Sequence, residues 1–172
     1  MALSQADFSR LVGEHGPALY RLAYRLIGDR VEAEDIVQDT FRSVWKGRSG
    51  YEPNRGDRAW LATILRRRAA DSYRKRTLRL VLSGDTPLEV ETEGVDPLAG
   101  DYSDEMQRAL DKLPSELRET LLLVVVGELT HQEAAEALRV PLGTVLSRVS
   151  RARGRLREYL SPAVAKAAGD SL

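Results

Sequence analysis

Arginine and hydroxyl side chains are concentrated near the C-terminal end of this 172-residue sequence. Six arginines fall between residues 139 and 157, and no acidic residue interrupts them. Thr144, Ser147, Arg148 and Arg151 recur at three- and four-residue intervals, which places them on one side of a helix. Arginine pairs with guanine through two hydrogen bonds, and Ser or Thr can contact bases or phosphates. A merely solvated helix face is usually mixed in charge, so the segment indicates a nucleic-acid contact.

A second basic block lies between residues 55 and 79, where nine basic residues accompany two acids. Within it, one helix face would carry Arg67, Asp71, Arg74 and Lys75, with Trp60 upstream. A cationic face of this kind predicts a second anionic contact site, with nucleic acid the obvious candidate. Two alternatives stay open: Trp60 is equally consistent with core packing, and Asp71 with an internal pairing to Arg67 and Lys75.

The segment from Val31 to Lys46 has a third pattern. Its apolar residues recur at helical spacing and predict one buried side. Polar groups remain on the exposed side: Glu34, Asp35, Gln38, Asp39 and Arg42. From these residues alone an ordinary solvated face is favoured over docking on another protein, because acidic helix faces are commonplace.

Several function classes have little support. Cysteine is absent, so disulfides and thiolate zinc sites are excluded, and the two histidines are far apart in sequence. No nucleophile–base pair or Gly-rich phosphate loop occurs. We therefore expect no catalytic activity, no metal or other cofactor, and no small-molecule substrate. The longest apolar run, residues 121–126, is far too short to cross a membrane, and no signal peptide is evident; we expect no membrane insertion and a cytoplasmic protein.

The elements that would position these groups are all predicted to be helical. A segment beginning at Ser4 should be interrupted at Gly13 and at Gly16-Pro17 and should end at Gly28-Asp29. A loop over 47–56 separates the helix over 31–46 from one over 57–76. Residues 78–101 are acidic and lack periodicity, which is typical of a linker. Further helices are predicted over 102–112, 114–126, 130–138 and 142–159.

The last two predicted helices form a helix-turn-helix. Thr130 and Glu133 make a capping-box pattern before a short alanine-rich helix, and the break at 139–141 leads into the longer arginine-rich one. We expect an all-α fold of two small helical domains joined by a flexible acidic linker. The expected boundaries are 1–77 for the first domain, 78–102 for the linker, 103–160 for the helix-turn-helix domain and 161–172 for a tail.

These residues resemble a known family. The stretch from Leu113 to Leu156, with LTHQEAA at 129–135, VPLGTV at 140–145 and Ser147-Arg148, is similar to the fourth conserved region of extracytoplasmic-function (ECF) sigma factors. Upstream, AEDIVQDTF at 33–41 with Trp45 resembles the family's polymerase-binding helix, and residues 60–76 resemble its promoter minus-ten helix. The resemblance spans residues 8–159 and occurs in the family's order.

The resemblance implies a non-catalytic subunit that binds core RNA polymerase and directs initiation at promoter DNA. It implies polymerase binding by Glu34, Asp35, Gln38, Asp39 and Arg42. The minus-ten contacts implied are Trp60, Arg67, Asp71, Arg74 and Lys75, and the minus-thirty-five contacts are Thr130, Thr144, Ser147, Arg148 and Arg151. Family habit alone implies an anti-sigma factor as a further partner.

The sequence departs from the family at three positions that bear on DNA. Arg67 stands where asparagine is usual, and Leu146 and Ser150 stand where basic or histidine residues are usual. These departures concern the promoter sequence and not the fold. Two other functions stay open: a conventional helix-turn-helix regulator that binds an operator as a dimer, and a sigma-like decoy that binds an anti-sigma protein without activating transcription.

Overall fold

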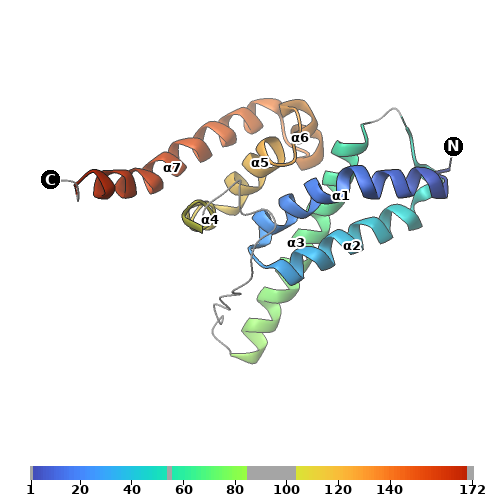
Figure 1. The fold of residues 1–172 in the computed structure, drawn as a ribbon, viewed down its shortest axis with the longest axis horizontal. Coiled ribbons are helices and arrows are strands. Elements are labelled where there is room, and N and C mark those ends of the chain that lie inside the picture. The colour runs from blue at the N-terminus through green and yellow to red at the C-terminus, as the bar shows by residue number, and fades with distance from the viewer. Residues whose placement is uncertain (1, 54–55, 85–103, 170–172) are drawn as a thin grey trace. The chain divides into compact units, whose positions relative to one another are not determined.

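A computed structural model describes residues 2–53, 56–84 and 104–169, with side chains as far as Ser161. Every regular element in these ranges is a helix, and no strand occurs in them, which confirms the all-α prediction. The chain divides into two compact units, residues 1–99 and 100–172. Each unit builds its own helical core (Figure 1).

The first unit contains three packed α-helices, α1 (Gln5–Ile27), α2 (Arg30–Lys46) and α3 (Asp57–Ser83), and a short 3-10 helix, η1 (Arg48–Gly50). Each α-helix contacts the other two. Their apolar sides meet in a core whose fully buried members include Leu11, Leu22, Val44, Leu61 and Leu65. The unit is therefore a three-helix bundle.

Helix α1 differs from the sequence prediction, because it runs without a break through Gly13, Gly16 and Pro17. Glycine costs about 1 kcal/mol in a helix interior, and proline removes one backbone hydrogen bond. Leu11 and Leu19, which flank the expected breaks, are both buried. Packing of this apolar face offsets the poor local propensity, so the expected interruptions were wrong.

The turn between α1 and α2 does match the sequence pattern. Gly28 ends α1 with φ of 77°, a left-handed conformation that a side chain would strain. Asp29 then caps α2, because its carboxylate accepts a hydrogen bond of 2.8 Å from the Glu32 amide. This two-residue connection brings α2 back along α1 and fixes which side of α2 is exposed.

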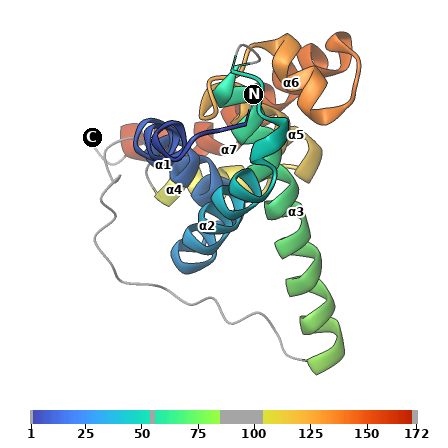
Figure 2. The ribbon, with the colours of Figure 1, turned by 90° about the vertical axis from the view of Figure 1, so that its right-hand side faces the viewer.

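Helix α3 is longer than predicted and ends at Ser83, followed by Gly84 with φ of 67°. Its buried residues stop at Ala69, so the second half contributes little to the core. In both views this half projects beyond α1 and α2 (Figures 1 and 2). Residues 78–83, expected to begin the linker, are instead the last turns of α3; the remainder of the expected linker, 85–102, lies outside the described residues.

The second unit contains α4 (Asp104–Asp111), α5 (Ser115–Val125), α6 (His131–Leu138) and α7 (Leu142–Gly169). Helix α7 contacts all three of the others. Residues 102 and 103, expected at the start of α4, lie outside the described ranges. Helix α7 extends ten residues beyond the predicted end at Tyr159, as far as Gly169.

Local interactions fix the helix-turn-helix formed by α6 and α7. The capping box is present: the Thr130 hydroxyl accepts from the Glu133 amide at 3.1 Å, and the Glu133 carboxylate accepts from the Thr130 amide at 2.8 Å. Arg139 ends α6 in the left-handed region with φ of 55°. The chain then reverses, and Thr144 and Val145 donate to the Pro141 carbonyl as α7 begins. The predicted motif is thus confirmed.

Candidate nucleic-acid interface

The buried side of α7 determines which residues it can offer to DNA. Val145, Val149 and Ala152 are buried and pack into the second unit's core. Opposite them, Ser147 and Arg151 are exposed, as the sequence pattern predicted. Thr144 and Arg148 lie at the border, because both are only partly exposed. The predicted set therefore covers the centre and one edge of the exposed face of α7.

Arg148 has a partner that the local sequence does not reveal. Its guanidinium Nη2 lies 3.4 Å from the Oε2 atom of Glu116, which belongs to the first turn of α5. The Arg148 side chain is 16% exposed, whereas that of Glu116 is 73% exposed. To reach a base, Arg148 must leave this ion pair and turn outward.

The other edge of the exposed face of α7 carries residues outside the predicted set. Leu146 and Ser150 are both exposed, and Leu146 retains 48% of its accessible area. The sequence pointed to Leu146 and Ser150 only because both differ from the residues that are usual in the family at these positions. The first two turns of α7 thus present an apolar side chain and hydroxyls where the family resemblance leads one to expect cations.

Thr130 occupies a different position from the α7 residues. It is exposed at the start of α6, and its hydroxyl is already an acceptor in the capping box. The hydroxyl keeps its own proton for donation, so a phosphate contact is compatible with the cap. Helix α6 therefore offers one polar group at its N-terminus, where the helix dipole favours an anion.

The cationic face of α3 is exposed as predicted. Arg67, Arg74 and Lys75 are all exposed, and Arg67 and Arg74 lie on the side opposite Leu61, Leu65 and Ala69. Asp71 pairs with Arg74 three residues later, not with Arg67 or Lys75. This pairing places one carboxylate inside the basic face and orders the Arg74 side chain.

The two ends of α3 are held differently by α1 and α2. Near its start, the Tyr51 hydroxyl donates to Asp57 at 2.7 Å, and Arg10 of α1 lies 3.5 Å from the same carboxylate. Burial, followed by the Asp57 carboxylate, raises the pKa of the Tyr51 phenol above its ordinary value. Trp60 rests against Tyr51 with ring centroids 5.4 Å apart and is partly exposed. Trp60 therefore packs against Tyr51 and also remains partly accessible to solvent.

Farther along α3, Glu32 of α2 joins the two helices. The Ser72 hydroxyl donates to Glu32 at 2.5 Å, and an Arg76 nitrogen lies 3.4 Å from its other oxygen. Arg76 belongs to the basic block of residues 55–79, but its side chain is directed toward Glu32 of α2. These contacts fix the rotation of α3 relative to α2.

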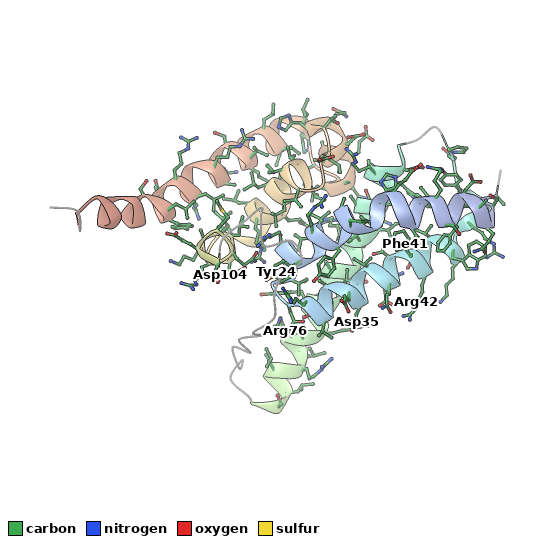
Figure 3. The ribbon with its side chains drawn as sticks, in the orientation of Figure 1. Tyr24, Asp35, Phe41, Arg42, Arg76 and Asp104 are labelled. Atoms are coloured by element: carbon green, nitrogen blue, oxygen red, sulfur yellow. The ribbon has the colours of Figure 1, made fainter. Side chains whose placement is uncertain are left out.

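Helix α2 exposes every polar residue that the sequence assigned to its outer side: Glu34, Asp35, Gln38, Asp39 and Arg42. Asp35 and Arg42 lie along this helix in Figure 3. Arg42 pairs with Asp39 at 2.8 Å. Val31, at the start of the same side, is 66% exposed. The face combines net negative charge with an apolar end, a composition suited to binding a protein.

Other kinds of site have no support in the described part of the chain. Among residues 2–53, 56–84 and 104–161, no three His, Cys, Asp or Glu side chains gather in a way that could hold a metal ion. No helix in the described ranges is both long and apolar enough to span a membrane. The candidate sites are therefore the helix faces of α2, α3 and α7.

A helix-turn-helix unit and a helical bundle with a cationic helix are together typical of a DNA-binding protein that acts in transcription. Two family matches sharpen that class: residues 11–79 match Sigma-70 region 2, and residues 103–156 match Sigma-70, region 4. The chain belongs to the sigma-70 family and, by its relatives, to the ECF RNA polymerase sigma factors. Members are non-catalytic initiation subunits of RNA polymerase, so the chain is not itself an enzyme.

Three known proteins illustrate the similarity. ECF RNA polymerase sigma factor SigE of Mycolicibacterium smegmatis is 35% identical over 90% of this chain, which spans 62% of the length of SigE. ECF RNA polymerase sigma factor SigW of Bacillus subtilis is 30% identical over 91% of this chain and 90% of SigW. The sigma factor RpoE of Bartonella quintana, solved in complex with the anti-sigma factor NepR, superposes with a TM-score of 0.79 at 32% identity. That match covers 90% of this chain and 97% of RpoE.

Proposed function

We propose that this chain directs promoter-specific initiation by dividing the work between its two units. The first unit binds core RNA polymerase through α2 and captures the melted minus-ten strand through α3. The second unit reads the minus-thirty-five duplex through α6 and α7. The observation that carries the proposal is that both sigma-70 regions are present in order, and each has an exposed face of the appropriate chemistry.

The residue assignments follow from exposure and charge. On α2, Glu34, Asp35, Gln38 and Asp39 can meet a basic protein surface without first breaking a core contact. On α3, the exposed cations can track the phosphates of a single strand while Trp60 supports a base. On α7, the outward hydroxyls and Arg151 can reach base edges in a major groove.

Regulation and compartment belong to the same proposal. The related RpoE of Bartonella quintana was solved with the anti-sigma factor NepR, and we place this chain under an anti-sigma protein of its own. Such a protein would have to cover the α2 or α7 face to prevent transcription. Because polymerase and chromosomal DNA are the targets, we place the chain in the cytoplasm.

Run-off transcription from a promoter library tests the proposal. Purified core polymerase is assayed with and without this chain, and we expect new start sites that share two spaced elements. Binding to core without stimulation would favour the sigma-like decoy. Absence of core binding would favour a regulator that acts on DNA alone and would overturn the proposal.

A charge-reversal pair tests the α2 assignment. Asp35→Arg should reduce binding to core polymerase severalfold, because it places a cation within the acidic face. Asp104→Arg, a reversal of another exposed helix acid in the second unit, serves as the matched control and should bind core normally. Binding is measured by gel filtration or fluorescence with labelled chain. Equal binding by both variants would remove α2 from the polymerase interface.

A further inference from the structure

The outward side of the first two turns of α7 has no charge. Gly143, Leu146, Ser147 and Ser150 are all exposed, and the first fully exposed arginine after them is Arg151. Arg148, the one cation within these turns, lies at the border and pairs with Glu116. While Arg148 stays in this ion pair, a base contact made by this part of the helix comes from an apolar group or from hydroxyls.

We propose that Leu146 determines specificity by packing on the C5-methyl group of a thymine in the minus-thirty-five element. The inference rests on the proposed function, because it places α7 in a major groove. It goes further by naming the residue that reads a base and the chemical group that is read.

The chemistry of the groove limits what an exposed leucine can contact. Among the four bases, thymine alone presents a methyl group in the major groove, beside its hydrogen-bonding groups. Leucine placed over a polar edge would displace water without replacing its hydrogen bonds, which is unfavourable. Contact with a methyl group removes apolar surface of both partners from water and is favourable. A thymine is therefore the base that Leu146 accepts best.

The local structure leaves Leu146 free for this contact. Its neighbours Val145 and Val149 fill the core, and Leu146 itself keeps 48% of its accessible area. Single exposed leucines are common on protein surfaces. Leu146 differs from them because it lies one turn into the second helix of a helix-turn-helix, the part that enters the groove. Ser147 beside it can hydrogen-bond a neighbouring base or phosphate.

Deoxyuridine gives a direct test, because it lacks only the C5-methyl group of thymine. A promoter is first chosen by run-off transcription with the full chain and core polymerase. Each thymine of its upstream element is then replaced by deoxyuridine, one at a time, and holoenzyme affinity is measured by competition. We expect one position at which the replacement weakens binding roughly three- to fivefold, the factor for one methyl group withdrawn from an apolar contact.

Variants assign that effect to Leu146. Leu146→Ala should abolish the difference between thymine and deoxyuridine, and Leu146→Met should retain most of it. Val125→Ala, which shortens another exposed apolar side chain of the same unit, should leave the difference unchanged. Because Leu146 is exposed, thermal unfolding of Leu146→Ala should match that of the parent chain.

The outcomes separate this inference from the proposed function. Specific promoter binding with no sensitive thymine, or with equal sensitivity in the parent and Leu146→Ala, would overturn the role of Leu146 and leave the sigma function standing. Equal loss of affinity for all upstream sequences in Leu146→Ala would also overturn it and indicate a protein contact. Failure to find any holoenzyme-dependent promoter would overturn both.

Discussion

Glu116 should hold Arg148 away from DNA, so removing its charge should strengthen promoter binding. The two side chains approach within 3.4 Å. At that distance Coulomb attraction amounts to about 1 kcal/mol in water and about 5 kcal/mol at an effective dielectric of 20. Because the Glu116 side chain is 73% exposed, the lower value applies. Measured exposed pairs contribute about 0.2 to 1 kcal/mol once side-chain ordering is included.

Releasing Arg148 therefore costs at most about 1 kcal/mol, which corresponds to roughly fivefold in affinity. Glu116→Gln should raise holoenzyme affinity for the promoter by about 1.4- to fivefold if Arg148 contacts DNA. Part of any gain could come from removing one negative charge near phosphates. Glu136→Gln, at another exposed acid of the same unit, measures that general effect.

A double-mutant cycle isolates the contribution of Arg148. Competition binding is measured at one fixed salt concentration for the parent, Glu116→Gln, Arg148→Ala and the double variant. In the Arg148→Ala background, Glu116→Gln should gain no more than the Glu136→Gln control. An equal gain in both backgrounds would refute the reasoning and would leave Arg148 as a side chain that joins α5 to α7. If Arg148→Ala loses as much affinity for random DNA as for the promoter, Arg148 contacts a phosphate and does not read a base.

Three further predictions concern stability, measured by thermal unfolding of the full chain. Thr130→Ala removes the capping box of α6 and should cost about 1 kcal/mol, or several degrees in the second unit's transition. Gly127→Ala should destabilise the chain by about 1 to 3 kcal/mol, because an added Cβ would lie 2.6 Å from the Leu123 carbonyl oxygen. Gly154→Ala, with open space around the added Cβ, should instead stabilise it by about 0.5 to 1 kcal/mol. A more stable Gly127→Ala than Gly154→Ala would contradict the structure. The pKa of Tyr51 is raised, so its stabilising contribution should be complete below about pH 10 and decrease as the pH rises through the folded-state pKa. Tyr51→Phe should lessen the alkaline loss of stability, and an unchanged loss would show that other groups cause it.

The fold was largely predictable because its strongest signals are local. The periodicity of residues 31–46, the Gly28-Asp29 turn and the Thr130–Glu133 capping box each describe structure within a few residues. Helix α1 was mispredicted for the opposite reason. Its glycines and proline are poor helix formers locally, and the burial of Leu11 and Leu19 that outweighs them is a tertiary effect.

The end of α3 shows a different limit of sequence reading. Beyond Ala69 this helix has no buried face, so no apolar stripe distinguishes it from a solvated segment. Residues 78–83 lack glycine and proline and can continue a helix already nucleated upstream, because extension costs far less than nucleation. Gly84 supplies the left-handed cap at which the helix ends.

The residues proposed to read DNA are the part of the site that charge counting along the chain predicted least well. The run from Arg139 to Arg157 contains no acid, yet Arg148 pairs with Glu116, which is 32 positions earlier. Helical spacing placed Arg148 on the polar side of α7 but could not reveal that it is only partly exposed or that a carboxylate of α5 pairs with it. The resemblance to a family has a different limit. It predicts the helix-turn-helix, but base recognition depends on the side chains at which this sequence differs from the family. Leu146 is the clearest instance, because replacing a cation by an exposed leucine preserves the helix and changes which base edge the helix can accept.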